Sequence, residues 1–179
     1  MKNFLPILIG LSILLISCAE SNNSETPSAE LQKLQMENDS LKQMAKQSSN
    51  KISTFLTFQK GDAEQAMNFY ISLFDHSEVV QLTRWGKDAP GKEGTIMQAT
   101  FTLDGKSYMC SDSPPIHEWD FTPATSNFVI CADESELKRL FTKLSENGEV
   151  MMPLGNYGFS QQFGWVVDPF GISWQLNLP

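Results

Sequence analysis

The stretch "VVDPFGISWQL" (residues 166–176) predicts a tight turn that leads into a strand. Asp168, Pro169 and Gly171 are turn residues, and the branched and aromatic side chains after them are typical of a strand. Side chains alternate between the two faces of a strand. Trp174 therefore points to one face, which we expect to pack on a helix. Gln175 points to the other, which either lines a wetter cavity or is simply a solvated face.

The same order of elements occurs twice in residues 51–179. "ISTFLTF" (52–58) and "SNFVICA" (126–132) read as strands, and each precedes a helix. Asp62 with Gln65, and Asp133 with Glu136, have the spacing of a capping box at the helix starts. Three further strands are expected after each helix, near 78–85, 95–102 and 106–112, and near 149–152, 162–168 and 172–178. The sequence thus predicts an α+β domain of two βαβββ modules, 51–113 and 124–179.

Superposing the closing hairpins of the two modules by their turns relates positions in the two halves. Asp104-Gly105 then matches residues 168–171, which pairs Tyr108 with Trp174 and Met109 with Gln175. Counting seven residues back from Asp62 and from Asp133 likewise pairs Phe55 with Ser126.

Two tandem βαβββ units resemble the glyoxalase/bleomycin-resistance, or vicinal oxygen chelate, superfamily. The phrases "DAEQAMNFYISLF", "FTLDGKSYM" and "FGWVVDPFGISWQL" resemble its PhnB-like branch, whose members often carry a demethylubiquinone-methyltransferase label. The resemblance implies an open cup built from the first and last strands of each module, either within one chain or between two chains of a homodimer. No glycine-rich strand-to-helix turn of the kind that holds a nucleotide-like cofactor is present, so we expect no cofactor and find no support for the methyltransferase label.

The superfamily's metalloenzymes hold a metal through His on the first strands and Glu on the last. Carried over, these positions are Phe55, Met109, Ser126 and Gln175. Phenylalanine offers no ligand, methionine is soft, and the serine hydroxyl and the amide are weak neutral oxygens. The resemblance therefore predicts the fold without its usual metal site.

No other catalytic constellation is evident in the sequence. His76 is expected in an exposed turn, and His117, between Glu118 and Asp120, in a surface loop; no nucleophile elbow, zinc-protease helix or phosphate loop is present. Cys110 and Cys131 are expected as buried packing residues, although an exported protein permits a disulfide between them.

Three functions stay open. The first is a binding module whose cup holds a small, partly apolar molecule; the others are a superfamily enzyme of lyase, isomerase or dioxygenase type, and a structural protein whose cup is filled by side chains such as Phe55 and Met109. The polar and aromatic candidates for the cup lining, besides Gln175, are Arg84, Tyr157, Gln162, Trp165, Ser173 and Asn177.

The N-terminus predicts export and lipidation. A positive charge at Lys2 and an apolar run from Phe4 to Ile16 are typical of a signal peptide, here residues 1–17. "LISC" (15–18) resembles the lipobox of bacterial lipoproteins, which implies that Cys18 carries acyl chains and anchors the chain to a bilayer of the cell envelope.

Residues 18–50 form a polar tether. Leu31, Leu34, Asn38, Leu41 and Ala45 alternate at spacings of three and four, which is the a/d pattern of a coiled coil. About two heptads is short for a coiled coil, so a single stalk helix is the favoured prediction. The net charge of −8 argues against nucleic acid as a partner, because such binding requires a basic patch.

Overall fold

The computed structural model describes residues 27–49 and 51–179. The predicted signal peptide and Cys18 lie outside the described residues. The chain divides into two compact units, Met1–Met44 and Ala45–Pro179. The first contains most of helix α1 (Pro27–Ser49), and the second contains the βαβββ domain. Within the described ranges, no helix is both long and apolar enough to span a bilayer.

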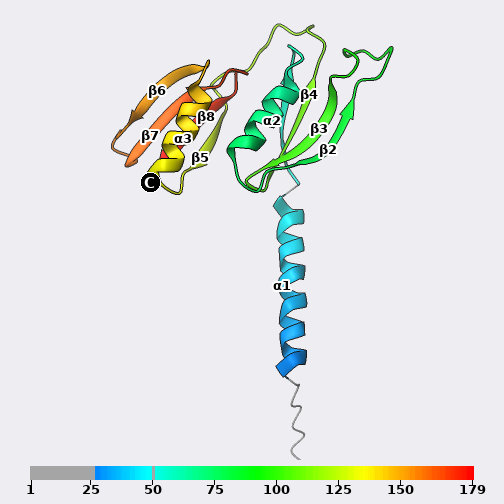
Figure 1. Cartoon of the computed structure of the whole chain (residues 1–179), viewed down its shortest axis with the longest axis vertical. Coiled ribbons are helices and arrows are strands. Elements are labelled where there is room, and N and C mark those ends of the chain that lie inside the picture. Colours follow the sequence, from blue (N-terminus) through cyan, green and yellow to red (C-terminus); the bar gives the residue numbers. More distant parts are fainter. Residues whose placement is uncertain (1–26, 50) are drawn as a thin grey trace, which may run out of the picture. The chain divides into compact units, whose positions relative to one another are not determined.

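The domain consists of two βαβββ modules, as the sequence predicts (Figure 1). The first comprises β1 (Thr54–Phe58), α2 (Ala63–Leu73), β2 (Val79–Arg84), β3 (Ile96–Leu103) and β4 (Lys106–Asp112). The second comprises β5 (Ser126–Ile130), α3 (Glu134–Ser145), β6 (Glu149–Gly155), β7 (Gln162–Val167) and β8 (Ser173–Leu178). The strand orders are β1-β4-β3-β2 and β5-β8-β7-β6, and in both sheets the first and last strands of the module are parallel neighbours.

Each sheet buries one face against its own helix (Figure 1). On β4, Tyr108 and Cys110 are buried in the core while Met109 between them is only partly buried. On β8, Trp174 is buried and Gln175 is only partly buried, which confirms the predicted alternation. We call the opposite side of each sheet, where Met109 and Gln175 lie, its outer face.

The turn between β7 and β8 is held by the side chain of Asp168. One carboxylate oxygen accepts hydrogen bonds from the backbone N–H groups of Phe170 (2.8 Å) and Ile172 (3.0 Å). The N–H of Gly171 donates to the Asp168 carbonyl at 2.9 Å, and Gly171 adopts a φ of +91°, which glycine accommodates without strain. The predicted turn residues therefore close the hairpin through a side-chain acceptor.

The same carboxylate joins this hairpin to the interface between the modules. Its second oxygen accepts a 2.8 Å hydrogen bond from the Trp174 indole N–H, and both residues are nearly inaccessible, with 3% and 2% of their surfaces exposed. The Trp174 ring lies 5.3 Å from Tyr70 of α2 and is stacked at 5.6 Å on Phe74, which follows that helix. The indole N–H of Trp174 thus secures its own hairpin while the ring packs on the other module.

A second contact between modules completes the C-terminus of α2. The last turn of this helix contains no basic residue, but the Arg139 guanidinium on α3 donates a 2.9 Å hydrogen bond to the carbonyl of Leu73. A cation at a helix C-terminus satisfies an otherwise unpaired carbonyl and opposes the helix dipole. The second module therefore supplies the cap that the first lacks.

The two helix starts differ from each other, and only one follows the prediction, in part. Asp133 accepts from the N–H of Glu136 at 2.9 Å, as the predicted box requires, whereas Glu136 accepts from the N–H of Ala132 and not of Asp133, so only half of the capping box is present at α3. Asp62 makes no capping hydrogen bond, and the box predicted with Gln65 is wrong. The buried carboxylate of Asp112 at the end of β4 accepts from Ala63 N–H instead, and also from Ile96 N–H, because the parallel neighbour of β1 ends beside the helix start.

We expect Asp168→Asn to lower the free energy of unfolding by about 2 kcal/mol at neutral pH, because an amide presents one acceptor oxygen to three buried donors. Burial raises the pKa of Asp168 above its usual value of 3.8. The native state therefore binds a proton more tightly than the unfolded chain, and the wild type gains stability as the pH falls toward 4 while the variant does not.

Urea unfolding at several pH values measures this difference, which should widen on acidification. Asp75→Asn, at an exposed carboxylate, is the control and should stay within about 0.5 kcal/mol of the wild type. A stability difference that is independent of pH would contradict the assignment of the buried charge.

Candidate functional site

Of the four positions that the resemblance relates to a metal site, only two are opposite each other in the sheets. Phe55 on β1 is opposite Met109 on β4 in the strand register. In the second module Gln175 on β8 is opposite Phe128, whereas Ser126 is opposite Ser173. If Met109 and Gln175 correspond, the counterpart of Phe55 is Phe128, so the predicted equivalence with Ser126 is wrong by two residues.

The wrong equivalence of Phe55 with Ser126 is explained by the different spacing between strand and helix in the two modules. Phe55 precedes the Asp62 at the start of α2 by seven residues, but Phe128 precedes Asp133 by five. The first module has two more residues between this strand position and the Asp before the helix, so counting back from the helix start overshoots in the second module. Strand pairing, which the sequence does not display, sets the true correspondence.

The corrected set is less suited to a metal than the predicted one. Phe55 and Phe128 offer no lone pair, and Met109 and Gln175 offer a thioether and a neutral amide. Across residues 27–49 and 51–179, no cluster of three or more His, Cys, Asp or Glu side chains could hold a metal ion. The donor set on the outer faces therefore does not fit the divalent metal that the superfamily's enzymes hold.

Polar groups on the outer face of the second module are held in fixed positions. Ser173 is almost fully buried, and its hydroxyl oxygen accepts a 2.8 Å hydrogen bond from the Trp165 indole N–H. The same oxygen lies 2.6 Å from the hydroxyl of Ser126 on the neighbouring strand. Trp165 is in turn opposite Gln175 across β7 and β8. Two predicted cup residues, Trp165 and Ser173, thus meet beside Gln175.

Aromatic side chains lie further along the same face, and Phe128 and Phe159 are strongly exposed whereas Phe163 is buried. Phe128 contacts Phe163 with ring centroids 6.5 Å apart, and Phe159 contacts Phe163 at 5.1 Å. Phe128 is 56% exposed, and Ile130 further along the same strand is 69% exposed. On the first module Phe55 is 48% exposed. Several large, exposed apolar side chains on one surface are typical of a site that binds a ligand or a partner protein.

Two of the predicted cup residues lie on the helix side of their sheets. Arg84 on β2 forms a bidentate ion pair with Glu64 in the first turn of α2, with contacts of 2.6 and 2.8 Å, and this pairing lowers the pKa of Glu64. Gln162 on β7 donates at 2.9 Å to Glu134, the first residue of α3. Both side chains are engaged by helix N-termini, so the prediction that they line the cup is wrong.

The remaining predicted residues have more local roles. Tyr157 donates its hydroxyl to the carbonyl of Pro153 at 2.8 Å and packs edge-on against Phe163. Asn177 lies on the outer face of β8 beyond Gln175, and its backbone carbonyl accepts from Cys131 N–H. Tyr157 and Asn177 therefore border the outer face of the second module.

One pocket of about 310 Å³ lies where the two modules meet along β1 and β5. Phe55, Ser126 and Ser173 line it, with Asp120, Phe121 and Thr122 of the connection between modules. We call it the linker pocket. It brings together Phe55 and Ser126 of the predicted set but not Met109 or Gln175, so neither described pocket is lined by both outer-face pairs.

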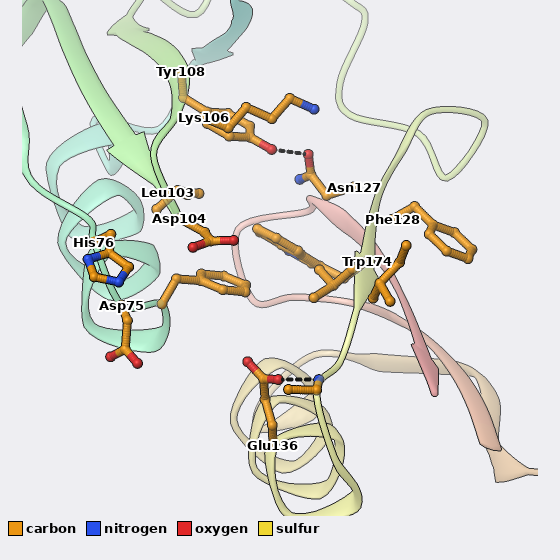
Figure 2. A pocket seen from close by; sticks show the side chains of 14 residues that line it. Asp75, His76, Leu103, Asp104, Lys106, Tyr108, Asn127, Phe128, Glu136 and Trp174 are labelled. Atoms are coloured by element: carbon orange, nitrogen blue, oxygen red, sulfur yellow. Dashed lines mark hydrogen bonds between the residues drawn. The ribbon is translucent and has the colours of Figure 1, made fainter. Parts of the chain in front are cut away.

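A second pocket of about 570 Å³ lies between the β3–β4 hairpin and β5 (Figure 2). Tyr108 donates its hydroxyl to the Asn127 amide oxygen at 2.8 Å across this space, and Asp104, Lys106 and the Trp174 ring face it (Figure 2). This pocket could not be predicted from the sequence, because its residues come from both modules and no local motif joins them.

The two histidines have no catalytic surroundings. His76 occupies a left-handed turn with a φ of +51°. His117 is exposed and stacked on Trp119 with ring centroids 4.5 Å apart, and its backbone N–H donates to Gln59. Neither histidine lies in a group that could hold a metal.

The cysteines Cys110 and Cys131 are buried as free thiols, as expected of packing residues. Burial raises the pKa of Cys110 to about 12 and the pKa of Cys131 to about 11. Because the thiolate is the reactive form, neither side chain can act as a nucleophile at neutral pH.

We expect iodoacetamide at pH 8 to leave both thiols of the folded domain (residues 51–179) unmodified, and to label both after unfolding in guanidinium. Mass spectrometry of tryptic peptides measures the labelling at each site. Rapid labelling of either cysteine in the folded domain would contradict the burial and the raised pKa.

Comparison with known proteins extends over nearly the whole domain. A solved structure from Bacillus cereus, described as a putative 3-demethylubiquinone-9 3-methyltransferase and PhnB protein, is 53% identical, covers 73% of this chain and all of its own, and superposes with a TM-score of 0.70. The Pseudomonas aeruginosa protein PA1353 is 28% identical, covers 71% of this chain and 96% of its own, and has a TM-score of 0.62.

Curated relatives are more distant. An uncharacterized protein of Mycobacterium tuberculosis is 27% identical over 127 residues, which is 66% of this chain and 69% of that protein. The profile of the family described as 3-demethylubiquinone-9 3-methyltransferase matches residues 50–177. The chain therefore belongs to the family described as 3-demethylubiquinone-9 3-methyltransferase, and its domain has the fold of the Bacillus cereus PhnB protein.

Proposed function

We propose that this protein is a membrane-anchored binding protein that holds a small, partly apolar organic molecule against the outer faces of its sheets. The observation that carries the proposal is the outer face of the second module. There, the exposed Phe128 and the buried Phe163 lie on the same face as a fixed polar group formed by Ser126, Trp165 and Ser173. Apolar walls with a few immobilised polar groups are typical of small-molecule sites.

A second copy of the chain would complete this site. Each outer face exposes a large aromatic side chain, Phe55 or Phe128, and neither described pocket is lined by residues of both outer-face pairs. Placing the outer face of one module against that of the other module in a second chain would bury these side chains and enclose a cup. Burial of exposed apolar surface supplies the driving force.

The site offers less to an enzyme than to a binding protein. The outer-face positions carry only weak, neutral donors, and burial raises the pKa of both thiols, which favours their unreactive protonated form. The connections that lead into α2 and α3 contain a single glycine, Gly61, so they do not form the glycine-rich turn that cradles a nucleotide-like cofactor. The family description names a methyltransferase activity, and these residues give no support to it here. Phe55, at 48% exposure, does not fill a cavity of the single chain either.

The anchor rests on the sequence. Lys2, the apolar run from Phe4 to Ile16 and the lipobox-like "LISC" before the polar tether together support lipidation of Cys18. More than one acyl chain would hold the protein stably at the bilayer, where a single chain would bind reversibly.

Substitution of Cys18 tests the anchor. In a bacterial host, the wild type should incorporate labelled palmitate and sediment with membranes, whereas Cys18→Ala should lose the label and leave the membrane fraction. Cys131→Ala is the control, because that thiol is buried in the domain, and it should keep both properties. Label retained in Cys18→Ala would contradict the proposal.

A fluorescent aromatic probe, anilinonaphthalene sulfonate, tests the binding surface. We expect the folded domain to bind it with saturable affinity, and Phe55→Ser to weaken binding by about tenfold, because an aromatic wall of the cup is lost. Gln175→Ala should change affinity less, since the probe presents few groups for an amide.

Ile116→Ser is the matched control, since Ile116 is an exposed apolar residue of the connection between modules that lies outside the outer faces. It should leave the affinity unchanged. Equal losses in Phe55→Ser and Ile116→Ser would mean that the probe senses general surface hydrophobicity, and unchanged binding in Phe55→Ser would place the site elsewhere.

A further inference from the structure

Helix α1 carries an exposed apolar stripe. The helix runs without interruption over 23 residues, Pro27–Ser49, and the stripe occupies the two heptads in its middle. Leu31, Leu34 and Leu41 are each 58–59% exposed. Most helices gain their stability by packing an apolar face, so this exposed stripe calls for a partner.

We propose that α1 pairs with α1 of a second copy of this chain as a parallel, in-register, two-stranded coiled coil. Spacings of three and four assign Leu31 and Asn38 to a positions and Leu34 and Leu41 to d positions. The a positions contain no β-branched residue, so the polar Asn38 is the feature that specifies the oligomeric state. This inference rests on α1 alone and does not depend on the proposed function of the domain.

Charge complementarity selects the parallel orientation. In this heptad register Glu37 occupies a g position and Lys42 the following e position. In a parallel dimer these two positions face each other across the interface. Glu37 of each chain therefore faces Lys42 of the other, which gives two equivalent ion pairs. An antiparallel pairing would instead set g against g and e against e, and would bring Glu30 and Glu37 into like-charged surroundings.

The charged side chains at these two positions, Glu37 and Lys42, form no ion pair among the described residues. The two residues are five apart in sequence, which places them on different parts of one helix surface rather than in the three- or four-residue spacing of pairs within a helix. Their charges are therefore available to a second helix.

Asn38 specifies the register of the pair. A single asparagine at an a position leaves a polar side chain in an apolar seam unless it hydrogen-bonds its counterpart in the second strand. Only the in-register parallel dimer places the two Asn38 side chains in one layer. The buried asparagine lowers the stability of the coiled coil but specifies a single alignment of the two helices, which is the best-attested role of a buried polar group.

The coiled coil is short, and its affinity in dilute solution will be modest. Anchoring both chains in one bilayer, or any association of their domains, raises the effective concentration of one helix at the other without new contacts. The coiled coil would then hold two neighbouring chains together as a dimer.

Disulfide trapping in membranes of cells that produce the full chain tests the proposal. Leu41→Cys, at a d position, should give a covalent dimer under mild oxidation. The adjacent Ser40→Cys, at the outward c position, should give at least tenfold less. The wild type measures the background from its own cysteines. Equal trapping at both positions, a Leu41→Cys chain that stays monomeric, or a cross-linked product with the mass of another protein would each overturn the proposal.

Exchanging the charges at positions 37 and 42 tests whether these two side chains face each other across the dimer, which a general loss of helix stability would not mimic. In the Leu41→Cys chain, Glu37→Lys should lower dimer formation several-fold, because the introduced ammonium group would face Lys42 of the other chain in both pairs. Adding Lys42→Glu should restore it. Failure of the double exchange to restore trapping would exclude the predicted pairing of the two positions.

Discussion

Burial of the Asp168 carboxylate beside the Trp174 indole is the interaction on which the rest of the domain depends. One carboxylate oxygen closes the β7–β8 turn by accepting hydrogen bonds from two backbone N–H groups, and the other accepts a hydrogen bond from the indole N–H. The indole ring in turn packs on Tyr70 and Phe74 of the first module. A buried charge is costly unless it is fully hydrogen-bonded, and here three donors offset that cost. One side chain thus links a turn, a strand and the interface between modules.

This arrangement determines which surfaces remain available for function. Because the helices and the cross-module contacts use the inner faces of the sheets, the outer faces carry the exposed aromatic side chains and the Ser126–Ser173–Trp165 group. The positions that the resemblance relates to a metal site fall on these same faces, and by strand register they hold two phenylalanines, a methionine and an amide. The donor chemistry of these faces therefore differs from that of the superfamily's metalloenzymes.

Much of the fold could be predicted because its signals are local. Alternation along residues 172–178 identified the buried and outer faces of β8, and the spacing of Asp133 and Glu136 located the start of α3. The site was harder to predict because it depends on strand register and on contacts distant in sequence. Counting from the helix starts selected Ser126 in place of Phe128, and Asp112 replaced Asp62 as the cap of α2. Arg84 and Gln162 looked suitable for a cup, but acidic residues at the helix starts engage them on the other side of the sheets.

Native mass spectrometry of the domain, residues 51–179, isolated gently from cells, tests the central claim most directly. It reports the number of chains, any bound organic molecule and any bound metal in a single measurement. The account predicts a species of two chains that carries a small organic molecule and no stoichiometric transition metal. A domain that retains one metal ion per site would contradict it, as would a monomer that never carries a ligand.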